Sequence, residues 1–416
     1  MVRAEIITIG DEILYGQILD TNTQWISLEL DKLGIKTVRK SSVGDQASEI
    51  TQILQEASSR ADIVFITGGL GPTKDDLTKK VLADFFDCGL AMHTEALQDV
   101  TEFFAKRGRE LSDINRDQAL LPTKAQFVPN KQGTAPCMWF EEKGLIWVSM
   151  PGVPFEMKAI METEVLPRVI KHFKTPVIFH KVIKTVGIGE SYLSDLIQDW
   201  ELSLPGHIKL AYLPSLGIVK LRLTAFGDDL KSLAADVETE LARVMPLISS
   251  YVFGYEKEEL AEVVGELLRK SKASLGVAES CTGGHLAHQF TQISGSSDYF
   301  TGGIVSYANQ VKMEQLGVSA SILSEFGAVS EPCIHAMAEG ARKVLGTTYS
   351  LATSGIAGPT GGTEEKPVGT VWIALAHPEG VITRKLQLAG TRMQNIHMTS
   401  LASINLLRRF LLHDLN

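Results

Sequence analysis

Residues 62–76 read Asp62-Ile-Val-Phe-Ile-Thr-Gly-Gly-Leu-Gly-Pro-Thr-Lys-Asp-Asp76. The first half is a short apolar run with β-branched residues, which is typical of a strand buried in a parallel sheet. Gly68, Gly69 and Gly71 in the second half let backbone N–H groups approach an anion, and the helix that follows points its positive end at the same place. Open parallel sheets bind ligands at the carboxyl ends of their strands. The stretch therefore predicts an α/β domain with a phosphate or nucleotide site in this loop.

Short apolar strands alternate with amphipathic helices on both sides of this stretch. We expect a strand at Glu5–Ile9, a helix at Asp20–Leu33 and a strand at Gly144–Met150. Such alternation favours a doubly wound parallel sheet with crossover helices. We expect the unit to close near residue 170, which gives a first domain over residues 1–170.

Acidic residues flank the glycine-rich loop. Asp75 and Asp76 follow it directly, and Asp45 comes just after the second expected strand. These carboxylates would repel a bare phosphate, but they suit a site in which a divalent cation lies between carboxylate and phosphate. The alternative is that Asp75 and Asp76 cap the following helix and interact with its dipole. A divalent metal is one of two hypotheses for this loop.

Length and composition limit the function classes. A chain of 416 residues, with 44% hydrophobic and 21% charged residues, is expected to form two or three folded domains. The formal net charge of −9 argues against nucleic acid or an anionic membrane as the main partner. The first residues lack a signal-peptide pattern and no long apolar run occurs, which predicts a cytoplasmic protein. The cysteines form no CxxC pair, so we expect reduced thiols at Cys88, Cys137, Cys281 and Cys333.

The pattern changes after residue 170. Residues 171–254 predict a small α+β module with an antiparallel sheet, because Leu213-Pro-Ser-Leu-Gly217 has the character of a hairpin turn. We expect its first strand at Val177–Val186 and its last at Ile248–Phe253. The module resembles a KH-type domain only loosely and has no GxxG between its helices, so we expect a spacer or oligomerisation role rather than RNA binding. Residues 255–416 predict a third, α/β domain.

The third domain contains a candidate nucleophile, Ser280, in the segment Ala278-Glu-Ser-Cys-Thr-Gly-Gly284. The serine lies on a tight connection between a strand and a helix, where the N–H groups of Cys281, Thr282 and Gly283 can form an oxyanion hole. No GxSxG elbow is present, so a Ser-His-Asp triad is not indicated. Cys281 is a rival nucleophile, although a small cysteine at such a turn is more often a packing residue.

Lys312 is the candidate base for Ser280. A lysine amine is deprotonated near neutral pH when burial disfavours its ammonium form. By itself Lys312 also fits an ordinary first-turn helix lysine. Gly358 and Gly361 belong to a glycine-rich loop that suits either a phosphate-binding nest or a flexible surface loop. Arg392 suits either a pair with the nucleotide phosphate or a solvated helix start.

Several separated blocks of the first domain form a specific set. They are Gly10-Asp-Glu-Ile-Leu14, Asp20-Thr-Asn22, Thr67-Gly-Gly-Leu-Gly-Pro-Thr73, Asp76-Leu-Thr78, Asn115 with Gln118, Leu121-Pro122, Asn130 with Gly133-Thr-Ala-Pro136, and Pro151-Gly-Val-Pro154 with Glu156-Met157. As a set these blocks resemble the molybdopterin-binding-like domain of the CinA family. The chain departs from that family at Cys137, where a glycine is usual, which leaves the local turn open.

This resemblance implies a metal-dependent ADP-ribose pyrophosphatase. The divalent ion would be Mg²⁺, Mn²⁺ or Co²⁺, with a monovalent cation as a further option. Asp45 and Asp76, with Asp75 beside them, match the pocket carboxylates. The nucleotide site would comprise Gly68, Gly69, Gly71, Thr73, Asn115 and Gly152.

A second set of blocks lies in the third domain. It comprises Ala278-Glu-Ser-Cys-Thr-Gly-Gly284, Gly302-Gly303 with Ser306-Tyr307 and Lys312, Val329-Ser-Glu-Pro332, and Ser354-Gly-Ile-Ala-Gly-Pro359 with Gly361-Gly-Thr-Glu-Glu-Lys-Pro-Val-Gly-Thr-Val371. This set resembles the CinA C-terminal domain, the nicotinamide-nucleotide amidase family. The resemblance implies hydrolysis of nicotinamide mononucleotide to nicotinic acid mononucleotide and ammonia by a Ser280–Lys312 dyad, with Tyr307 in the pocket and no cofactor. It also implies a homodimer.

Three functions follow from these observations. The leading hypothesis is a bifunctional hydrolase of pyridine nucleotide recycling. A second is a molybdopterin or nucleotide binding protein whose first domain holds a ligand without catalysis. A third is an accessory protein of DNA uptake, against which the acidic balance argues because binding to a phosphate backbone needs local positive charge.

Overall fold

The computed structural model describes residues 2–73 and 76–414, and its chain folds into two compact units. One unit comprises residues 1–179 with 226–233, and the other comprises residues 180–225 with 234–416. The middle segment therefore divides between the units, and the expected boundaries at 170 and 254 stay predictions. In the described part of the chain, no helix combines the length and apolar character needed to cross a bilayer.

The first unit is built on a six-stranded sheet of order β2-β1-β3-β8-β7-β6. Its strands are β1 (Arg3–Ile9), β2 (Lys36–Val43), β3 (Ile63–Thr67), β6 (Gln126–Val128), β7 (Cys137–Glu142) and β8 (Leu145–Met150). The first four strands in spatial order are parallel, as expected, but β7 and β6 are antiparallel to their neighbours. The expected parallel sheet is therefore a mixed sheet, with β7 and β6 added antiparallel at one edge.

A two-residue turn explains the antiparallel strand β7. Lys143 and Gly144 both have positive φ, 53° and 80°, between β7 and β8. Two successive residues of positive φ form the type I′ turn whose twist matches a hairpin. Cys137, where the family pattern left the turn open, is fully buried at the start of β7.

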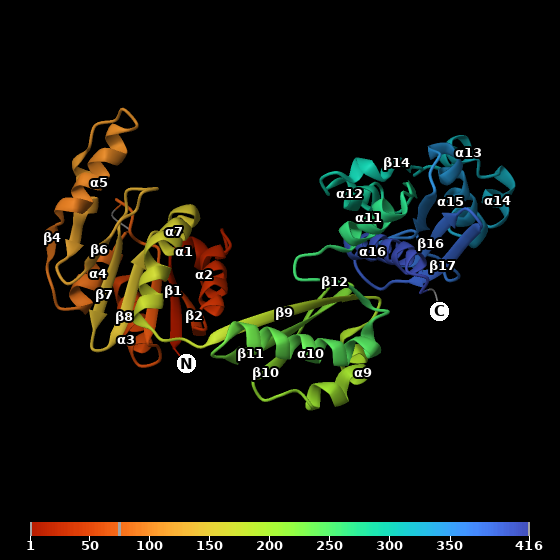
Figure 1. The fold of residues 1–416 in the computed structure, drawn as a ribbon. Helices are drawn as coiled ribbons and strands as arrows, with labels where there is room; N and C mark the ends of the chain where they lie inside the picture. Colours follow the sequence, from red (N-terminus) through yellow and green to blue (C-terminus); the bar gives the residue numbers. More distant parts are fainter. Residues whose placement is uncertain (1, 74–75, 415–416) are drawn as a thin grey trace. The chain divides into compact units, whose positions relative to one another are not determined.

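Helices cover both faces of this sheet (Figure 1). On one face α2 (Thr21–Lys32) and α7 (Pro154–Ile160) contribute Ile26, Leu30 and Met157 to a core with β1 and β3. On the other face α3 (Ala47–Ser58) and α4 (Thr78–Phe85) pack a second core. The remaining elements are α1 (Asp11–Leu14), β4 (Leu90–Met92), α5 (Thr94–Ala105), α6 (Asp113–Arg116), a 3₁₀ turn (Asp117–Ala119), β5 (Leu120–Pro122), a π-helical turn (Met161–Val165) and α8 (Leu166–His172).

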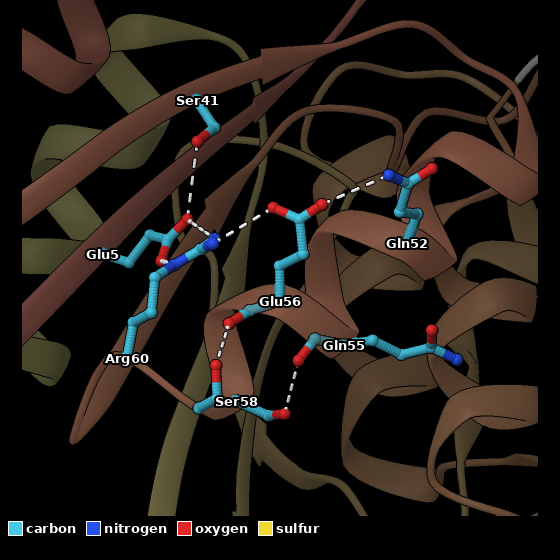
Figure 2. A network of polar contacts seen from close by, with 8 residues as sticks. Glu5, Ser41, Gln52, Gln55, Glu56, Ser58 and Arg60 are labelled. Atoms are coloured by element: carbon cyan, nitrogen blue, oxygen red, sulfur yellow. Dashed lines mark hydrogen bonds and ion pairs between the residues drawn. The ribbon is translucent and has the colours of Figure 1, made fainter.

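A polar network ties β1 to α3 at the end of this sheet remote from the glycine-rich loop. Figure 2 shows the Arg60 guanidinium between Glu5 and Glu56. Its Nε and Nη2 donate to the two carboxylate oxygens of the buried Glu5 at 3.1 and 2.9 Å, and Nη1 donates to Glu56 at 3.0 Å. A buried carboxylate needs such a bidentate partner, because its charge would otherwise be uncompensated.

The middle segment forms a four-stranded sheet of order β10-β11-β9-β12 with two helices. Its elements are β9 (Val177–Val186), α9 (Glu190–Leu202), β10 (Ile208–Ser215), β11 (Ile218–Gly227), α10 (Leu230–Ile248) and β12 (Val252–Tyr255). The pairs β10–β11 and β9–β12 are antiparallel, as expected. We expected the strand to begin at Ile248, but α10 continues to that residue through Pro246 because Val244 and Ile248 are both fully buried.

The C-terminal part has a five-stranded sheet of order β14-β13-β15-β16-β17. Strands β14, β13 and β15 are parallel, and β16 and β17 are antiparallel additions. The elements are α11 (Leu260–Ser271), β13 (Leu275–Glu279), α12 (His285–Thr291), a 3₁₀ turn (Ser296–Asp298), β14 (Phe300–Val305), α13 (Asn309–Leu316), α14 (Ala320–Glu325), α15 (Glu331–Leu345), β15 (Tyr349–Gly355), β16 (Thr370–His377), β17 (Gly380–Gln387) and α16 (Arg392–Leu411).

Candidate functional site

Ser280 lies directly after β13, at the carboxyl end of the parallel part of the sheet. Its backbone N–H donates to the carbonyl of Thr353 at 2.9 Å. The loop can turn sharply into α12 because Gly283 and Gly284 have φ of 59° and 102°, a region that favours glycine. The nucleophile predicted from the sequence is therefore held at a strand-to-helix turn.

Glu279 closes this turn, and the sequence reasoning missed it. Its buried carboxylate accepts hydrogen bonds from the backbone N–H groups of Gly284 and Leu286 at 3.0 Å and of Ala287 at 2.8 Å. These donors are the unpaired N–H groups at the start of α12, which a carboxylate stabilises. An acidic residue at the end of an otherwise apolar strand was the available signal.

Lys312 reaches Ser280 from α13. Its Nζ lies 3.1 Å from Ser280 Oγ, and it also donates to the carbonyls of Ser306 at 2.7 Å and Tyr307 at 3.2 Å. The residue is only 1% exposed, and burial disfavours its ammonium form and lowers the pKa of Lys312 below its ordinary value. A serine hydroxyl thus faces an amine whose neutral form is favoured by burial.

The backbone N–H groups that follow Ser280 differ in whether they already donate a hydrogen bond to another residue. The Gly283 N–H donates to the Ser280 carbonyl at 3.2 Å. In residues 2–73 and 76–414, the N–H groups of Cys281 and Thr282 donate to no carbonyl, carboxylate or hydroxyl. Of the three expected oxyanion donors, Gly283 is therefore engaged, Thr282 is available, and the Cys281 N–H interacts only with its own thiol.

The rival nucleophile Cys281 is in an unfavourable environment. Burial raises the pKa of its thiol to about 12, with a smaller opposing effect from its own backbone N–H. A thiol of this pKa carries almost no thiolate at neutral pH, and the thiolate is the reactive form. The nearby His285 hydrogen-bonds through Nδ1 to Ser400 Oγ at 2.8 Å and not to Ser280.

Arg392, Tyr307 and Gly358 come together beside this dyad. Arg392 lies at the start of α16 and donates to the Gly358 carbonyl at 2.9 Å and to Tyr307 Oη at 3.2 Å. Tyr307 is 63% exposed, so its ring is accessible to a ligand. Gly361 lies on the same loop, exposed, with φ of 91°.

Asn395 holds that loop, and the sequence reasoning missed it too. Its buried side-chain amide donates to the carbonyls of Ala357 at 3.1 Å and Gly390 at 2.9 Å, and its Oδ1 accepts from the Gly390 N–H. The first turn of α16 therefore holds the glycine-rich loop through Ala357 and Gly358, and its Arg392 contacts Tyr307. A polar residue on the buried face of a long helix was the signal in the sequence.

The first unit contains a cavity of about 600 Å³ at the carboxyl ends of its parallel strands. The predicted residues that line it are Gly68, Gly69, Gly71, Thr73, Gly152, Asp45 and Asp76. Asn115 does not line it; this side chain lies on α6 and donates to Ser112 Oγ at 2.9 Å. Asp75 lies outside the described residues.

Glycine is required at Gly68 in this cavity wall, and a side chain at Gly71 would displace the Asp76 carboxylate. A Cβ at Gly68, where φ is 114°, would lie 2.0 Å from the Ile9 carbonyl oxygen. A Cβ at Gly71 would lie 2.5 Å from Asp76 Oδ2. The loop therefore packs its backbone against β1 and against a carboxylate, which leaves backbone rather than side chains at the cavity surface.

The described lining of this cavity is acidic. It includes Glu12, Asp20, Asp45, Asp76 and Glu156 but no lysine or arginine. Burial, and then the charges of Asp11, Glu12 and Asp76, raise the pKa of Asp45, against a hydrogen bond from the Asp11 N–H. Burial also raises the pKa of Glu156, although Asn130 Nδ2 donates to it at 2.7 Å. An anionic ligand here needs a cation to offset these charges.

The expected alternative, in which Asp76 caps the following helix, is wrong: the N-cap of α4 is Leu77 and no described side chain caps it. Asp76 Oδ2 instead accepts from the Thr73 N–H at 2.9 Å and from Thr73 Oγ1 at 2.6 Å, within the preceding loop. No group of three or more His, Cys, Asp or Glu side chains is arranged to hold a metal within the described ranges. Two carboxylates together with substrate phosphates nevertheless suffice for Mg²⁺, so Asp45 and Asp76 fit a metal that arrives with its nucleotide.

Comparisons with known proteins cover nearly the whole chain. Residues 257–411 match the family model "CinA C-terminal domain", residues 5–171 match "Probable molybdopterin binding domain", and residues 180–254 match "Damage-inducible protein CinA KH domain". A CinA-like protein of Cytophaga hutchinsonii is 52% identical over 408 residues, which is 98% of each chain. A CinA-like protein of Nostoc punctiforme is 42% identical over 99% of this chain and 100% of its own.

Solved structures of similar proteins cover single parts of the chain. The protein CinA of Thermoplasma acidophilum, whose function is described as unknown, is 31% identical and covers 40% of this chain and 97% of its own, with a TM-score of 0.38. The family matches and the observed sheets confirm the predicted fold class: an N-terminal molybdopterin-binding-like α/β domain, a small KH-like α+β domain and a C-terminal α/β domain.

Proposed function

Since the chain belongs to the CinA family, we propose that its C-terminal site deamidates nicotinamide mononucleotide to nicotinic acid mononucleotide and ammonia. The observation that supports this proposal is the contact of a buried amine, Lys312 Nζ, with Ser280 Oγ at 3.1 Å. In the neutral amine, two N–H bonds would serve the carbonyls of Ser306 and Tyr307, which leaves the lone pair for the serine hydroxyl. This is the arrangement of a general base beside a nucleophile.

The proposed reaction has two steps, acylation of Ser280 and hydrolysis of the acyl-serine. Ser280 Oγ attacks the carboxamide carbon and passes its proton to Lys312 Nζ, while the N–H groups of Cys281 and Thr282 donate to the oxyanion. Lys312 returns the proton to the departing nitrogen, which leaves as ammonia and gives an acyl-serine. Water attacks the ester with Lys312 again as base, and Ser280 recovers its proton as the carboxylate product leaves. Arg392 and Tyr307 would bind the phosphate and the substrate rings.

Ammonia release from nicotinamide mononucleotide tests this assignment. Ser280→Ala and Lys312→Met should each lower kcat by about a thousandfold or more, as removal of one member of a catalytic unit does in other hydrolases. Cys281→Ala is the matched control and should retain activity, because only its backbone takes part. Full activity in Ser280→Ala, or its loss in Cys281→Ala with intact folding, would refute the dyad.

For the N-terminal domain we propose a metal-dependent ADP-ribose pyrophosphatase. The supporting observation is an acidic cavity whose glycine backbone faces the ligand space. Asp45 and Asp76 would hold a divalent cation, which neutralises the diphosphate when bound. The N–H groups of the loop at Gly69 and Gly71 would orient the phosphates, and Glu156, which lines the same cavity and has a raised pKa, would exchange a proton with water or ribose.

Release of AMP from ADP-ribose in the presence of Mn²⁺ tests this second activity. Asp45→Asn and Asp76→Asn should abolish release, and Asn115→Ala should not, because Asn115 does not line the cavity. Unchanged turnover in both aspartate variants would contradict the assignment. Tight binding of ADP-ribose without turnover would instead support a binding protein, a reading that the Thr73–Asp76 hydrogen bonds also allow.

A further inference from the structure

A buried asparagine holds one wall of the acidic cavity in the first unit. Asn130, which is 5% exposed, lies in the loop between β6 and β7. Its Oδ1 accepts from the backbone N–H groups of Gln132 and Gly133, both at 3.0 Å, and its Nδ2 donates to the Ala135 carbonyl at 2.8 Å. These partners fix the orientation of the amide, because only the oxygen can accept and only the nitrogen can donate. The loop is therefore folded around this side chain.

The second N–H of that amide binds Glu156. Asn130 Nδ2 donates to Glu156 Oε2 at 2.7 Å. Gly133 lies against the same oxygen, since a Cβ at this position would lie 1.9 Å from it. Within residues 2–73 and 76–414 no donor reaches Oε1, and this oxygen is not one of the buried atoms there that lack a partner. Because Glu156 lines the cavity, one of its oxygens is held by the wall and the other is open to a ligand or water.

The surroundings of Glu156 suit proton transfer. Burial raises the pKa of Glu156, and the hydrogen bond from Asn130 opposes that rise because it favours the carboxylate. The lysines nearest to the two residues in sequence are engaged elsewhere: Lys131 pairs with a carboxylate of α5, and Lys158 lies over an indole ring of α2. The other acidic residues in the described lining of the cavity are Glu12, Asp20, Asp45 and Asp76. A carboxylate of raised pKa is a better base than an ordinary one, since its pKa is closer to the operating pH.

On the basis of the pyrophosphatase function proposed above, we propose that Glu156 is the base that takes a proton from the attacking water, and that Asn130 is the residue that positions it. The water oxygen forms a bond to one phosphorus of ADP-ribose while its proton passes to Glu156 Oε1. The bond from that phosphorus to the bridging oxygen breaks, and its electron pair leaves with the second phosphate, so AMP and ribose 5-phosphate are released. Asn130 touches no reacting atom; it holds Oε2 and so directs Oε1.

The pH dependence of kcat/KM for ADP-ribose, with Mn²⁺ saturating at every pH, tests both residues in the full-length protein. The wild type should lose activity as the pH falls, with slope one and a midpoint at the pKa of Glu156. Glu156→Gln keeps an acceptor for Asn130 but cannot take the proton, so it should lower kcat about a hundredfold, leave KM nearly unchanged and remove that midpoint.

Asn130→Asp keeps an acceptor for the two backbone N–H groups and loses the donor to Glu156. The midpoint should therefore rise by about one pH unit or more. Asn115→Asp makes the same change of charge outside the cavity and should leave the midpoint in place. Gly133→Ala is a second variant that leaves Asn130 intact but crowds Oε2, and it should also lower kcat.

Labelling of Glu156 supplies a readout that needs no turnover. A diazo reagent esterifies protonated carboxyl groups, and mass spectrometry of the metal-free full-length protein follows the peptide that contains Glu156 as the pH is lowered. The labelling midpoint should rise in Asn130→Asp and stay unchanged in Asn115→Asp.

The possible outcomes are distinct. Wild-type turnover that Glu156→Gln retains, or a midpoint that Asn130→Asp leaves unchanged in both assays, overturns the roles of Glu156 and Asn130 and leaves the pyrophosphatase standing. Absence of wild-type turnover contradicts the pyrophosphatase and with it the base, while the labelling midpoints still decide whether Asn130 controls the Glu156 carboxylate.

Discussion

Lys312 is a lysine with almost no solvent contact, and its three nearest polar partners include two backbone carbonyls. An ammonium group transferred from water to such a place loses hydration, so the neutral amine gains relative stability. The same residue at an exposed helix start would be an ordinary cation. Burial is therefore what turns a lysine beside a serine into a candidate base.

The first prediction concerns the pH dependence of the deamidation. Burial lowers the pKa of Lys312, and the base must be neutral. The logarithm of kcat/KM should rise with slope one and level off at a pH below about 10.4, the ordinary pKa of lysine. A rate that is independent of pH from 6 upward, or that still rises beyond the ordinary lysine pKa, would contradict the role of Lys312.

Asp45 gives the second prediction, which concerns stability. Its pKa is raised in the folded protein by burial and neighbouring acids. The folded state therefore disfavours the carboxylate, and this cost is present above the folded pKa and disappears as the pH falls below the unfolded value. Asp45→Asn should raise Tm at pH 7 by a small amount, because the group is partly solvated, and should have no such effect near pH 3.

A bound divalent cation should make the Asp45 carboxylate stabilise the folded state instead of destabilising it. A divalent cation offsets the charges of Asp45 and Asp76 and stabilises only the folded state, so Mn²⁺ should raise the Tm of the wild type in a concentration-dependent way. The increase should be lost in Asp45→Asn. An equal Mn²⁺ effect in both proteins would place the cation elsewhere, whatever the outcome of the activity assays.

At the scale of elements, strand β13, helix α12 and the turn between them together fix the position of Ser280. Glu279 ends the strand, and its carboxylate accepts from three N–H groups on the far side of the turn. The glycines at 283 and 284 let the chain turn between them. The position of the nucleophile therefore depends on a buried carboxylate that is bonded to the backbone N–H groups of α12 and its cap.

The third prediction tests Glu279 as a positioning residue. Glu279→Gln places an amide group where N–H donors converge, so it should cost about 1–3 kcal/mol of unfolding free energy and lower kcat more than KM. Urea unfolding and steady-state kinetics measure the two effects. Glu266→Gln, whose side chain is about half exposed and pairs with Arg269, is the control and should leave both nearly unchanged.

At the scale of the molecule, each compact unit contains an arginine that hydrogen-bonds to buried groups of another segment. In the second unit the Arg408 side chain, 1% exposed, donates to the carbonyls of Val252 at 2.6 Å and Ser250 at 2.7 Å, and so joins α16 to the end of the KH-like sheet. In the first unit Arg60 compensates the buried Glu5. Two hydrogen bonds from Arg408 thus link the C-terminal part to the KH-like part.

The fourth prediction concerns substitution of Arg408 and Arg60, with unfolding followed by calorimetry. Because each unit has its own core, we expect two unfolding transitions. Arg408→Met should lower the free energy of unfolding of one transition by about 2 kcal/mol or more, since it leaves carbonyls without their donor. Arg60→Met should lower the other by a similar amount or more. A shift of the same transition by both variants would contradict two separate units.

Much of the fold was predictable because it depends on local patterns. The alternation of strands and helices and the strand at Val177–Val186 follow from periodicity. The β7–β8 hairpin was missed because its turn is Lys143-Gly144, and the positive φ of a lysine has no clear sequence signal. The end of α10 was missed because burial of Ile248 outweighs the disruptive effect of Pro246.

The sequence by itself determined which residues are chemically able to act: Ser280 at a glycine-rich turn, a lysine 32 positions later, and glycines with carboxylates in the first unit. Only the tertiary structure decided which of them meet. The adjacent parallel strands β13 and β14 bring Ser280 and Lys312 to 3.1 Å, Arg392 reaches Tyr307 across 85 positions, and Asn115 lies outside the cavity. The reason is physical: burial, distance and pKa depend on which distant segments pack together, and no local pattern specifies that packing.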